Sequence, residues 1–137
     1  MITPSKRAIS AYVQTGIETG VPDADAHRLV LMLFDGALAA VADARNRLRS
    51  GDIAGRGQAI SKAIAIVDEG LRASLDSKAG GEIATQLEGL YRYVCSKLLE
   101  ANLRSQAGPL EEASSLLTQL QSAWAQIAPA QPEPAHA

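Results

Sequence analysis

Hydrophobic positions along the chain recur every three or four residues, and no segment alternates apolar and polar positions at a period of two. The first spacing places side chains on one face of an α-helix, whereas the second is typical of a half-buried strand. Proline and glycine divide the chain into long helical segments with short breaks between them. Helices joined by short loops pack as antiparallel neighbours. The pattern therefore predicts an all-α protein, an antiparallel up-and-down four-helix bundle.

Four long helices are expected, each bounded by a capping residue or a glycine. The first covers residues 23–49, with an aspartate at its start and Ser50-Gly51 after its last turn. The other three cover residues 52–75, 82–105 and 108–127. In the helix over residues 82–105 the expected buried stripe consists of Ile83, Leu87, Leu90, Val94 and Leu98.

The chain is expected to divide into three parts, of which one is a folded domain. Residues 1–22 form an N-terminal segment with a short, labile helix that Gly16 and Gly20 end or fray. Residues 23–128 form the bundle, and residues 129–137 form an extended, disordered tail rich in proline. A chain of 137 residues leaves no room for a second folded domain.

The helix over residues 23–49 is apolar around an unusually wide arc. Its apolar side chains between residues 29 and 41 spread over about 200°, which is twice the arc that a one-sided helix needs. The other helices have ordinary stripes, although Ile66, Leu99 and Leu103 lie off theirs. The surplus predicts either a central helix or an apolar groove for a partner. The N-terminal segment is expected either simply to cover this surface or to cover it until a partner displaces it.

Two adjacent residues inside this helix are weak helix formers. Gly36 costs about 1 kcal/mol relative to alanine in a helix, and Asp35 is also unfavourable. A position that lacks a side chain at such a cost indicates close approach of another element. We therefore expect a neighbouring helix or a bound guest to lie against Gly36.

Composition and charge exclude several classes of function. The net charge of −2 provides no field that would gather nucleic acid. The longest mostly apolar stretch, residues 29–42, is shorter than the roughly 20 residues that span a bilayer, and Asp35 and Gly36 interrupt it. The N-terminus shows no pattern of a secretion leader. We expect a cytoplasmic protein without membrane insertion.

Residues that support catalysis or metal binding are scarce. Cys95 is the only cysteine, and the two histidines, His27 and His136, lie at a helix start and in the tail. The sequence contains no HExxH motif and no glycine-rich phosphate loop. We expect no enzyme, no cofactor and no metal, with Cys95 as a small half-buried apolar residue.

Several segments occur in an order that is highly specific. They are Ala11-Tyr12, ETGV from Glu18, HRLVLMLFDGAL from His27, SKAIAIVDEGLRASLD from Ser61, GGEIATQLEGLYRYV from Gly80 and LEAN from Leu99. In these segments the chain resembles the FliS family of flagellin export chaperones, over nearly its whole length from Tyr12 to Ile127. Two positions depart from the family pattern: Phe34, where tyrosine is frequent, and Ala26, where many relatives have proline.

The resemblance implies a helical bundle that binds the C-terminal amphipathic region of flagellin in the cytosol, one chaperone per subunit. It implies that this binding prevents premature polymerisation and assists delivery to the flagellar type III export apparatus. A component of the export gate is a candidate second partner. The segment around Tyr12 is expected to occupy part of the binding surface and to move aside.

Seven residues are expected to contact the partner, because amphipathic helices dock through apolar side chains three and four positions apart. They are Leu31, Phe34 and Leu38, with Ile66, Tyr91 and Tyr93 as flanking contacts and Tyr12 as the displaceable cover. Core packing remains the alternative for each of them, including Phe34, Tyr91 and Ile66. If Phe34 lies on the surface, Phe34→Asp keeps the helicity and abolishes binding.

Two other functions remain open at this point. A helical bundle would also bury its surplus apolar surface by forming a homo-oligomeric scaffold. It would equally serve as a chaperone for another secreted helical protein. The mass of the protein in solution, with and without a flagellin peptide, separates these hypotheses.

Overall fold

The computed structural model describes residues 24–75 and 77–127. The elements are α2 (Ala24–Ser50), α3 (Ile53–Ala65), the π-helical segment η1 (Ile66–Arg72), α4 (Ser77–Arg104) and α5 (Ala107–Gln126). Across these described ranges the protein is all-α, as predicted. The predictions for residues 1–22, including Tyr12, and for residues 129–137 lie outside the described residues.

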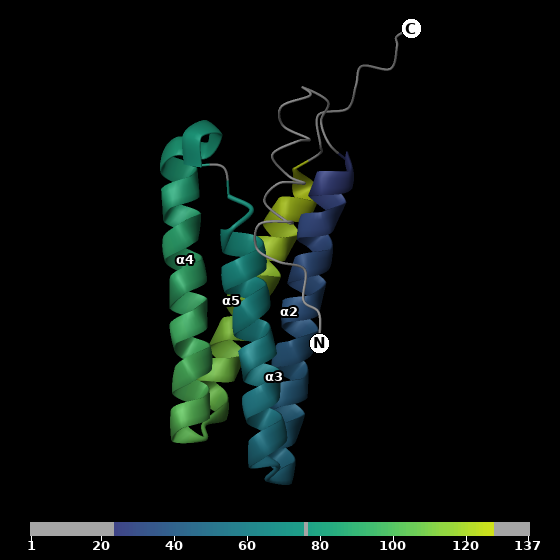
Figure 1. The fold of residues 1–137 in the computed structure, drawn as a ribbon, viewed down its shortest axis with the longest axis vertical. Helices are drawn as coiled ribbons and strands as arrows, with labels where there is room; N and C mark the ends of the chain where they lie inside the picture. Colours follow the sequence, from purple (N-terminus) through teal and green to yellow (C-terminus); the bar gives the residue numbers. More distant parts are fainter. Residues whose placement is uncertain (1–23, 76, 128–137) are drawn as a thin grey trace, which may run out of the picture.

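The helices run alternately in opposite directions along one axis (Figure 1). Two sides of α2 pack against other elements, one against α3 and η1 and the other against α5. The helix α4 likewise packs between η1 with α3 and α5, and it lies across the core from α2: among the described residues no Cα atom of α2 is within 8 Å of a Cα atom of α4, and the two helices meet through the rings of Phe34 and Tyr91. The bundle is therefore a closed ring of four units, which are α2, α3 with η1, α4 and α5, arranged around a common core. Because α2 is one member of this ring, the interpretation of α2 as a central helix is wrong.

The hydrophobic core lies between the inner faces of the helices. Its largest fully buried side chains come from every helix: Phe34, Val41, Ile60, Val67, Leu71, Val94, Leu98, Leu110 and Leu117. Each such side chain stabilises the fold by about 1.5–3 kcal/mol relative to an exposed one. Between them, α2 contributes the buried alanines Ala37, Ala40 and Ala44, whose small size lets the neighbouring helices come close.

The buried face of α4 differs from the predicted stripe. Ile83 and Leu90 are exposed, so their prediction as core residues is wrong. The buried positions are spaced by three and four residues: Ala84, Tyr91, Val94, Leu98 and Ala101, with Leu87 partly buried. The reason is the neighbouring element, since Arg72 Nη1 of η1 lies 3.7 Å from Glu88 Oε2 and η1 covers this side of α4.

The structure adds detail at two predicted helix boundaries. The helix expected over residues 52–75 continues without a break from α3 into a π-helical turn, η1, which has wider hydrogen bonding than an α-helix. The element α4 starts at Ser77, but a kink at the non-helical Gly81 separates its first residues from the regular helix, which begins at Glu82 as predicted. Gly81 has φ 54° and ψ −125°, a conformation that glycine adopts at little cost.

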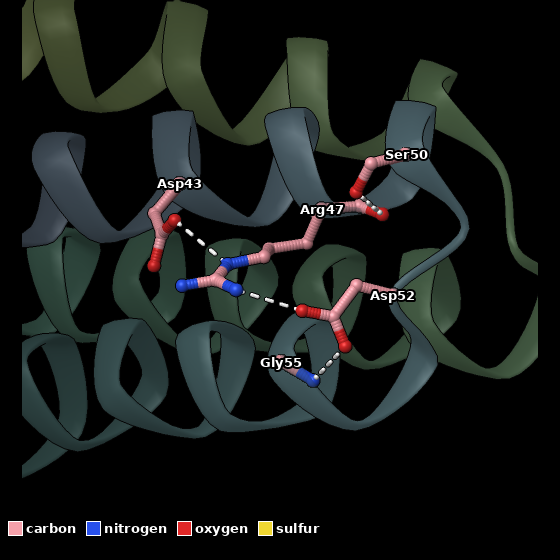
Figure 2. Close-up of polar contacts among 5 residues, drawn as sticks. All are labelled: Asp43, Arg47, Ser50, Asp52 and Gly55. Atoms are coloured by element: carbon pink, nitrogen blue, oxygen red, sulfur yellow. Dashed lines mark hydrogen bonds and ion pairs between the residues drawn. The ribbon is translucent and has the colours of Figure 1, made fainter.

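One aspartate holds the corner between α2 and α3 (Figure 2). Asp52 Oδ1 accepts a hydrogen bond from the Gly55 backbone N–H at 2.9 Å, and Oδ2 accepts one from Arg47 Nη1 at 2.7 Å. Asp43 Oδ1 accepts a third bond, from Arg47 Nε at 3.2 Å. A side chain at residue 55 would collide with the Asp52 carboxylate, so this cap requires glycine. The bonds from Gly55 and Arg47 hold the pKa of Asp52 below its ordinary value.

Candidate functional site

Two of the predicted partner contacts lie in the core of the bundle. The Phe34 side chain is 1% exposed and that of Tyr91 is 4% exposed. Their rings face each other across the core with centroids 6.4 Å apart. An aspartate at residue 34 is therefore expected to unfold the bundle, which corrects the expectation of intact helicity. A contact of either ring with a partner stays a prediction, and it requires the core to open.

The side chain of Ile66 is engaged by the contact between η1 and α2. A Cβ atom at Gly36 would lie 3.3 Å from Ile66 Cδ1, and one at Gly70 would lie 3.0 Å from Leu33 Cδ2. Each helix therefore presents a glycine to an aliphatic side chain of the other. The expectation of close approach at Gly36 is confirmed, and the neighbour is a helix of the same chain.

Leu31 and Leu38 lie on the side of α2 that turns toward α5. Both are half-buried, and Leu38 packs against the core. Between them, Asp35 Oδ1 accepts a hydrogen bond of 2.6 Å from Gln121 Nε2 on α5. Their apolar surface is thus partly available at the α2–α5 boundary, away from Ile66 on the other side of α2.

Tyr93 is exposed and takes part in a polar network between α4 and α5. Its hydroxyl donates a hydrogen bond to Glu112 Oε2, and this bond raises the pKa of Tyr93. Lys97 Nζ lies 5.4 Å from the centre of the Tyr93 ring and 3.3 Å from Glu100 Oε1. The bond to Glu100 raises the pKa of Lys97, so the lysine remains a cation. The network fixes the orientation of the Tyr93 ring at the surface.

His27 and Trp124 join the first turn of α2 to the last turn of α5. Their rings stack with centroids 5.1 Å apart and planes 17° from parallel. Trp124 Nε1 donates to the His27 carbonyl at 3.0 Å, and His27 Nε2 donates to the Trp124 carbonyl at 2.9 Å. Sequence reasoning found no role for His27, because 97 residues separate it from its partner. The only signal was an indole N–H, which usually finds an acceptor when partly buried.

The outer face of α4 carries two exposed leucines that the predicted contact residues do not include. Leu99 is 52% exposed and Leu103 is 82% exposed. They lie one helical turn apart, so both side chains point to the same side. The available signal was their position off the apolar stripe of this helix. Other large apolar side chains are exposed elsewhere: Met32, Ile53, Ile83 and Ile127.

The chemistry of the described residues favours binding. Burial raises the pKa of the Cys95 thiol to about 11, so the thiol stays protonated at neutral pH and is a weak nucleophile. Residues 24–75 and 77–127 contain no group of three side chains that would hold a metal ion. Over the same residues, no helix has the length and apolar character that crossing a bilayer demands. Fold and surface together define the class of protein as an α-helical bundle with exposed apolar side chains, which favours binding of other polypeptides over catalysis.

Comparisons with known proteins assign the family. The family model described as flagellar protein FliS matches residues 8–131. The flagellar secretion chaperone FliS of Salmonella typhimurium is 50% identical over 121 residues, 88% of this chain and 90% of the relative. The secretion chaperone FliSB of Pseudomonas aeruginosa is 42% identical over 118 residues (86% and 93%), and FliS of Escherichia coli is 39% identical over 118 residues (86% and 87%). The chain belongs to the FliS family, whose chaperone role in flagellar export is non-enzymatic.

Proposed function

We propose that this protein is a cytosolic export chaperone that binds the C-terminal amphipathic region of flagellin, one chaperone per subunit. Binding prevents premature polymerisation of flagellin and assists its delivery to the flagellar type III export apparatus, where an export-gate component is a second partner. Membership of the FliS family supports a substrate secreted through the flagellum.

The observation that carries the proposal is apolar surface left over after the core is filled. The inner side of α4 is buried through Leu98 and Ala101, while Leu99 and Leu103 remain exposed on the same helix. An amphipathic guest helix would cover such side chains with its own apolar stripe. A guest that is disordered before binding loses conformational entropy when it folds on the bundle, so a large interface still releases its guest. Export requires that release.

The proposed contacts are the predicted residues that the structure leaves at least partly exposed. Leu31, Leu38 and Tyr93 belong to this set, and Ile66 contributes the part of its surface that Gly36 does not cover. Tyr12 is proposed as the cover that the guest displaces. Because Leu31 and Ile66 lie on opposite sides of α2, one short guest helix does not reach all of them, and the guest must wrap around the bundle.

The test is the mass in solution of the full chain, measured by light scattering with and without a flagellin C-terminal peptide. The expected result is a monomer that forms a 1:1 complex with the peptide, while a scrambled peptide of the same composition does not bind. A stable dimer that ignores the flagellin peptide would refute the proposal and favour the homo-oligomeric scaffold. Binding only to a peptide from another secreted helical protein would favour the other chaperone.

A further inference from the structure

Arg56 on α3 is the one charged residue that is buried in the described ranges, with 7% of its surface exposed. Its side chain lies against the C-terminal part of α4. Nε donates a hydrogen bond to Asn102 Oδ1 at 3.0 Å, and Nη2 donates one to the Asn102 carbonyl oxygen at 3.2 Å. A single asparagine of α4 therefore holds this guanidinium through two uncharged acceptors.

The charge of Arg56 has no counter-ion. In the part of the chain that the structure describes, no carboxylate forms an ion pair with it. Two arginines that are more exposed each have one: Arg45 Nε lies 2.7 Å from Glu111 Oε1, and Arg72 Nε lies 2.6 Å from Asp68 Oδ1. Buried charges are usually paired, because removing an isolated ion from water is costly. A ligand that carries a negative charge would therefore stabilise this site.

The contact between Arg56 and Asn102 leaves hydrogen-bond donors unused by other described residues. The two bonds occupy the edge of the guanidinium formed by Nε and Nη2, so the edge formed by Nη1 and the second hydrogen of Nη2 is left over. Asn102 Nδ2 is unused as well. Within the described structure, Arg45 Nε is the one side-chain nitrogen or oxygen atom that is sealed from solvent without a hydrogen bond. Arg56 Nη1 and Asn102 Nδ2 are therefore accessible from the surface.

Gly57, the next residue of α3, leaves space beside these donors. A Cβ atom at residue 57 would lie 4.0 Å from Asn102 Nδ2, which is an ordinary contact distance. Glycine is unfavourable inside a helix, and alanine would fit here, so packing within the chain does not explain the glycine. The missing side chain keeps the approach to Nδ2 open for an atom of another molecule.

A carboxylate matches this set of donors better than other groups of a polypeptide do. The unused edge of the guanidinium presents two N–H groups in one plane, which pair with the two oxygens of a carboxylate and neutralise the charge. The Asn102 amide supplies a third N–H group beside them. A backbone carbonyl, in contrast, has one oxygen and would leave the charge of Arg56 without a counter-ion.

We propose that Arg56 and Asn102 form a carboxylate site that binds one acidic group of the guest polypeptide. The inference rests on the proposed function, because the guest is the flagellin C-terminal region. The carboxylate pairs with Arg56 Nη1 and Nη2 and accepts a hydrogen bond from Asn102 Nδ2. This pairing fixes the position of one guest residue along the bundle and distinguishes an acid from its amide at that position.

The first experiment replaces the amide of Asn102 with a carboxylate in the full chain. Asn102→Asp keeps an acceptor for Arg56 and supplies a counter-ion, so thermal unfolding is expected at the same temperature or above it. The new carboxylate also repels an acidic guest group, and calorimetric titration with the flagellin C-terminal peptide is expected to show at least tenfold weaker binding. Asn46→Asp adds the same charge at an exposed position of α2 and is expected to change Kd less than threefold.

The second experiment changes the guest instead. In one peptide every Asp and Glu is replaced by Asn and Gln, and in another only the C-terminal carboxyl group is amidated. One of the two is expected to bind the wild type at least tenfold more weakly, which identifies the source of the carboxylate. Asn102→Asp is expected to weaken binding of that peptide less than threefold further, because the group that it repels is already absent.

The outcomes separate this inference from the proposed function. If the wild type does not bind the natural peptide, the proposed function fails. If it binds, but Asn102→Asp leaves the affinity unchanged or weakens binding of all peptides equally, the chaperone function stands and the carboxylate site is overturned. Equal affinity of the wild type for all three peptides has the same meaning.

If Asn102→Asp does not fold, nuclear magnetic resonance of the wild type replaces it. The natural peptide is expected to shift the side-chain amide resonances of Asn102, and the peptide without the relevant carboxylate is expected to leave them in place. Equal responses to both peptides would overturn the carboxylate site.

Discussion

The continuous helix formed by α3 and η1 packs against its two neighbours through different kinds of contact. Toward α2, aliphatic side chains lie against glycines, with Ile66 over Gly36 and Leu33 over Gly70. Toward the C-terminal end of α4, a polar contact between Arg56 and Asn102 joins the helices. The first side uses its apolar side chains for packing within the chain, and the second leaves leucines at the surface.

This difference shows that whether an apolar side chain is buried or exposed depends on how closely the backbones of the two neighbouring helices approach each other. A glycine in one helix lets the backbone of the neighbouring helix approach closely, so the aliphatic side chain opposite the glycine is packed against it. A pair of long polar side chains instead fixes the register without demanding apolar cover around it. The same leucine-rich composition thus provides both a core and a surface for another polypeptide.

The largest expected effect separates a core residue from a surface leucine. Phe34→Ala is expected to lower the free energy of unfolding by about 3–5 kcal/mol, because it leaves a cavity in the core. Leu103→Ala is expected to change it by less than about 0.5 kcal/mol, as surface substitutions usually do. Urea denaturation of both variants gives the values. A loss at Leu103 as large as that at Phe34 would mean that the outer face of α4 is packed, and the contrast would fail.

An intermediate effect is expected from the polar contact. Asn102→Ala removes the acceptor of Arg56 Nε and leaves a buried donor without its partner, at a cost of about 1–3 kcal/mol. Asn46→Ala, at an exposed position of α2, serves as the control and is expected to be neutral or slightly stabilising. Thermal unfolding measures both. Equal stability of the two variants would show that Arg56 does not depend on Asn102.

The smallest effect tests the contact between α2 and η1 through two helical glycines. Gly89→Ala meets no neighbour within 4 Å, so the higher helix propensity of alanine is expected to stabilise the protein by about 1 kcal/mol. At Gly36 the same gain is offset by crowding against Ile66 Cδ1, and the net stabilisation is expected to be smaller or reversed. Denaturant midpoints of the two variants provide the comparison. The same stabilisation at both sites would contradict a close approach at Gly36.

The sequence was sufficient to predict the helices, their order and the need for a small residue at Gly36. These features depend on local spacing, capping and helix propensity, which neighbouring residues determine. The π-helical turn of η1 and the helical residues before the kink at Gly81 were not predicted, because tertiary packing and a single glycine dihedral decide them.

The candidate site was harder to predict than the fold. A helical wheel ranks Phe34 and Tyr91 as apolar positions but does not say whether the facing surface belongs to the same chain. Ile83 and Leu90 fit a stripe as well as Ala84 and Tyr91 do, and only the position of η1 decides between the two sets. The pair of His27 and Trp124 depends on a contact across 97 residues, which no local pattern encodes.

The stacked pair of His27 and Trp124 has a consequence for the order in which the protein folds during synthesis. Of the helices in the described ranges, the ribosome makes α2 first and α5 last, yet these two pack against each other. The ring of four helices therefore closes only after Trp124 has been translated and has reached the first turn of α2. A nascent chain that stops before residue 107 lacks Leu110 and Leu117 and keeps an open core. Folding of this bundle is thus a late event of synthesis, and deletions from the end of α5 are expected to act on the whole domain.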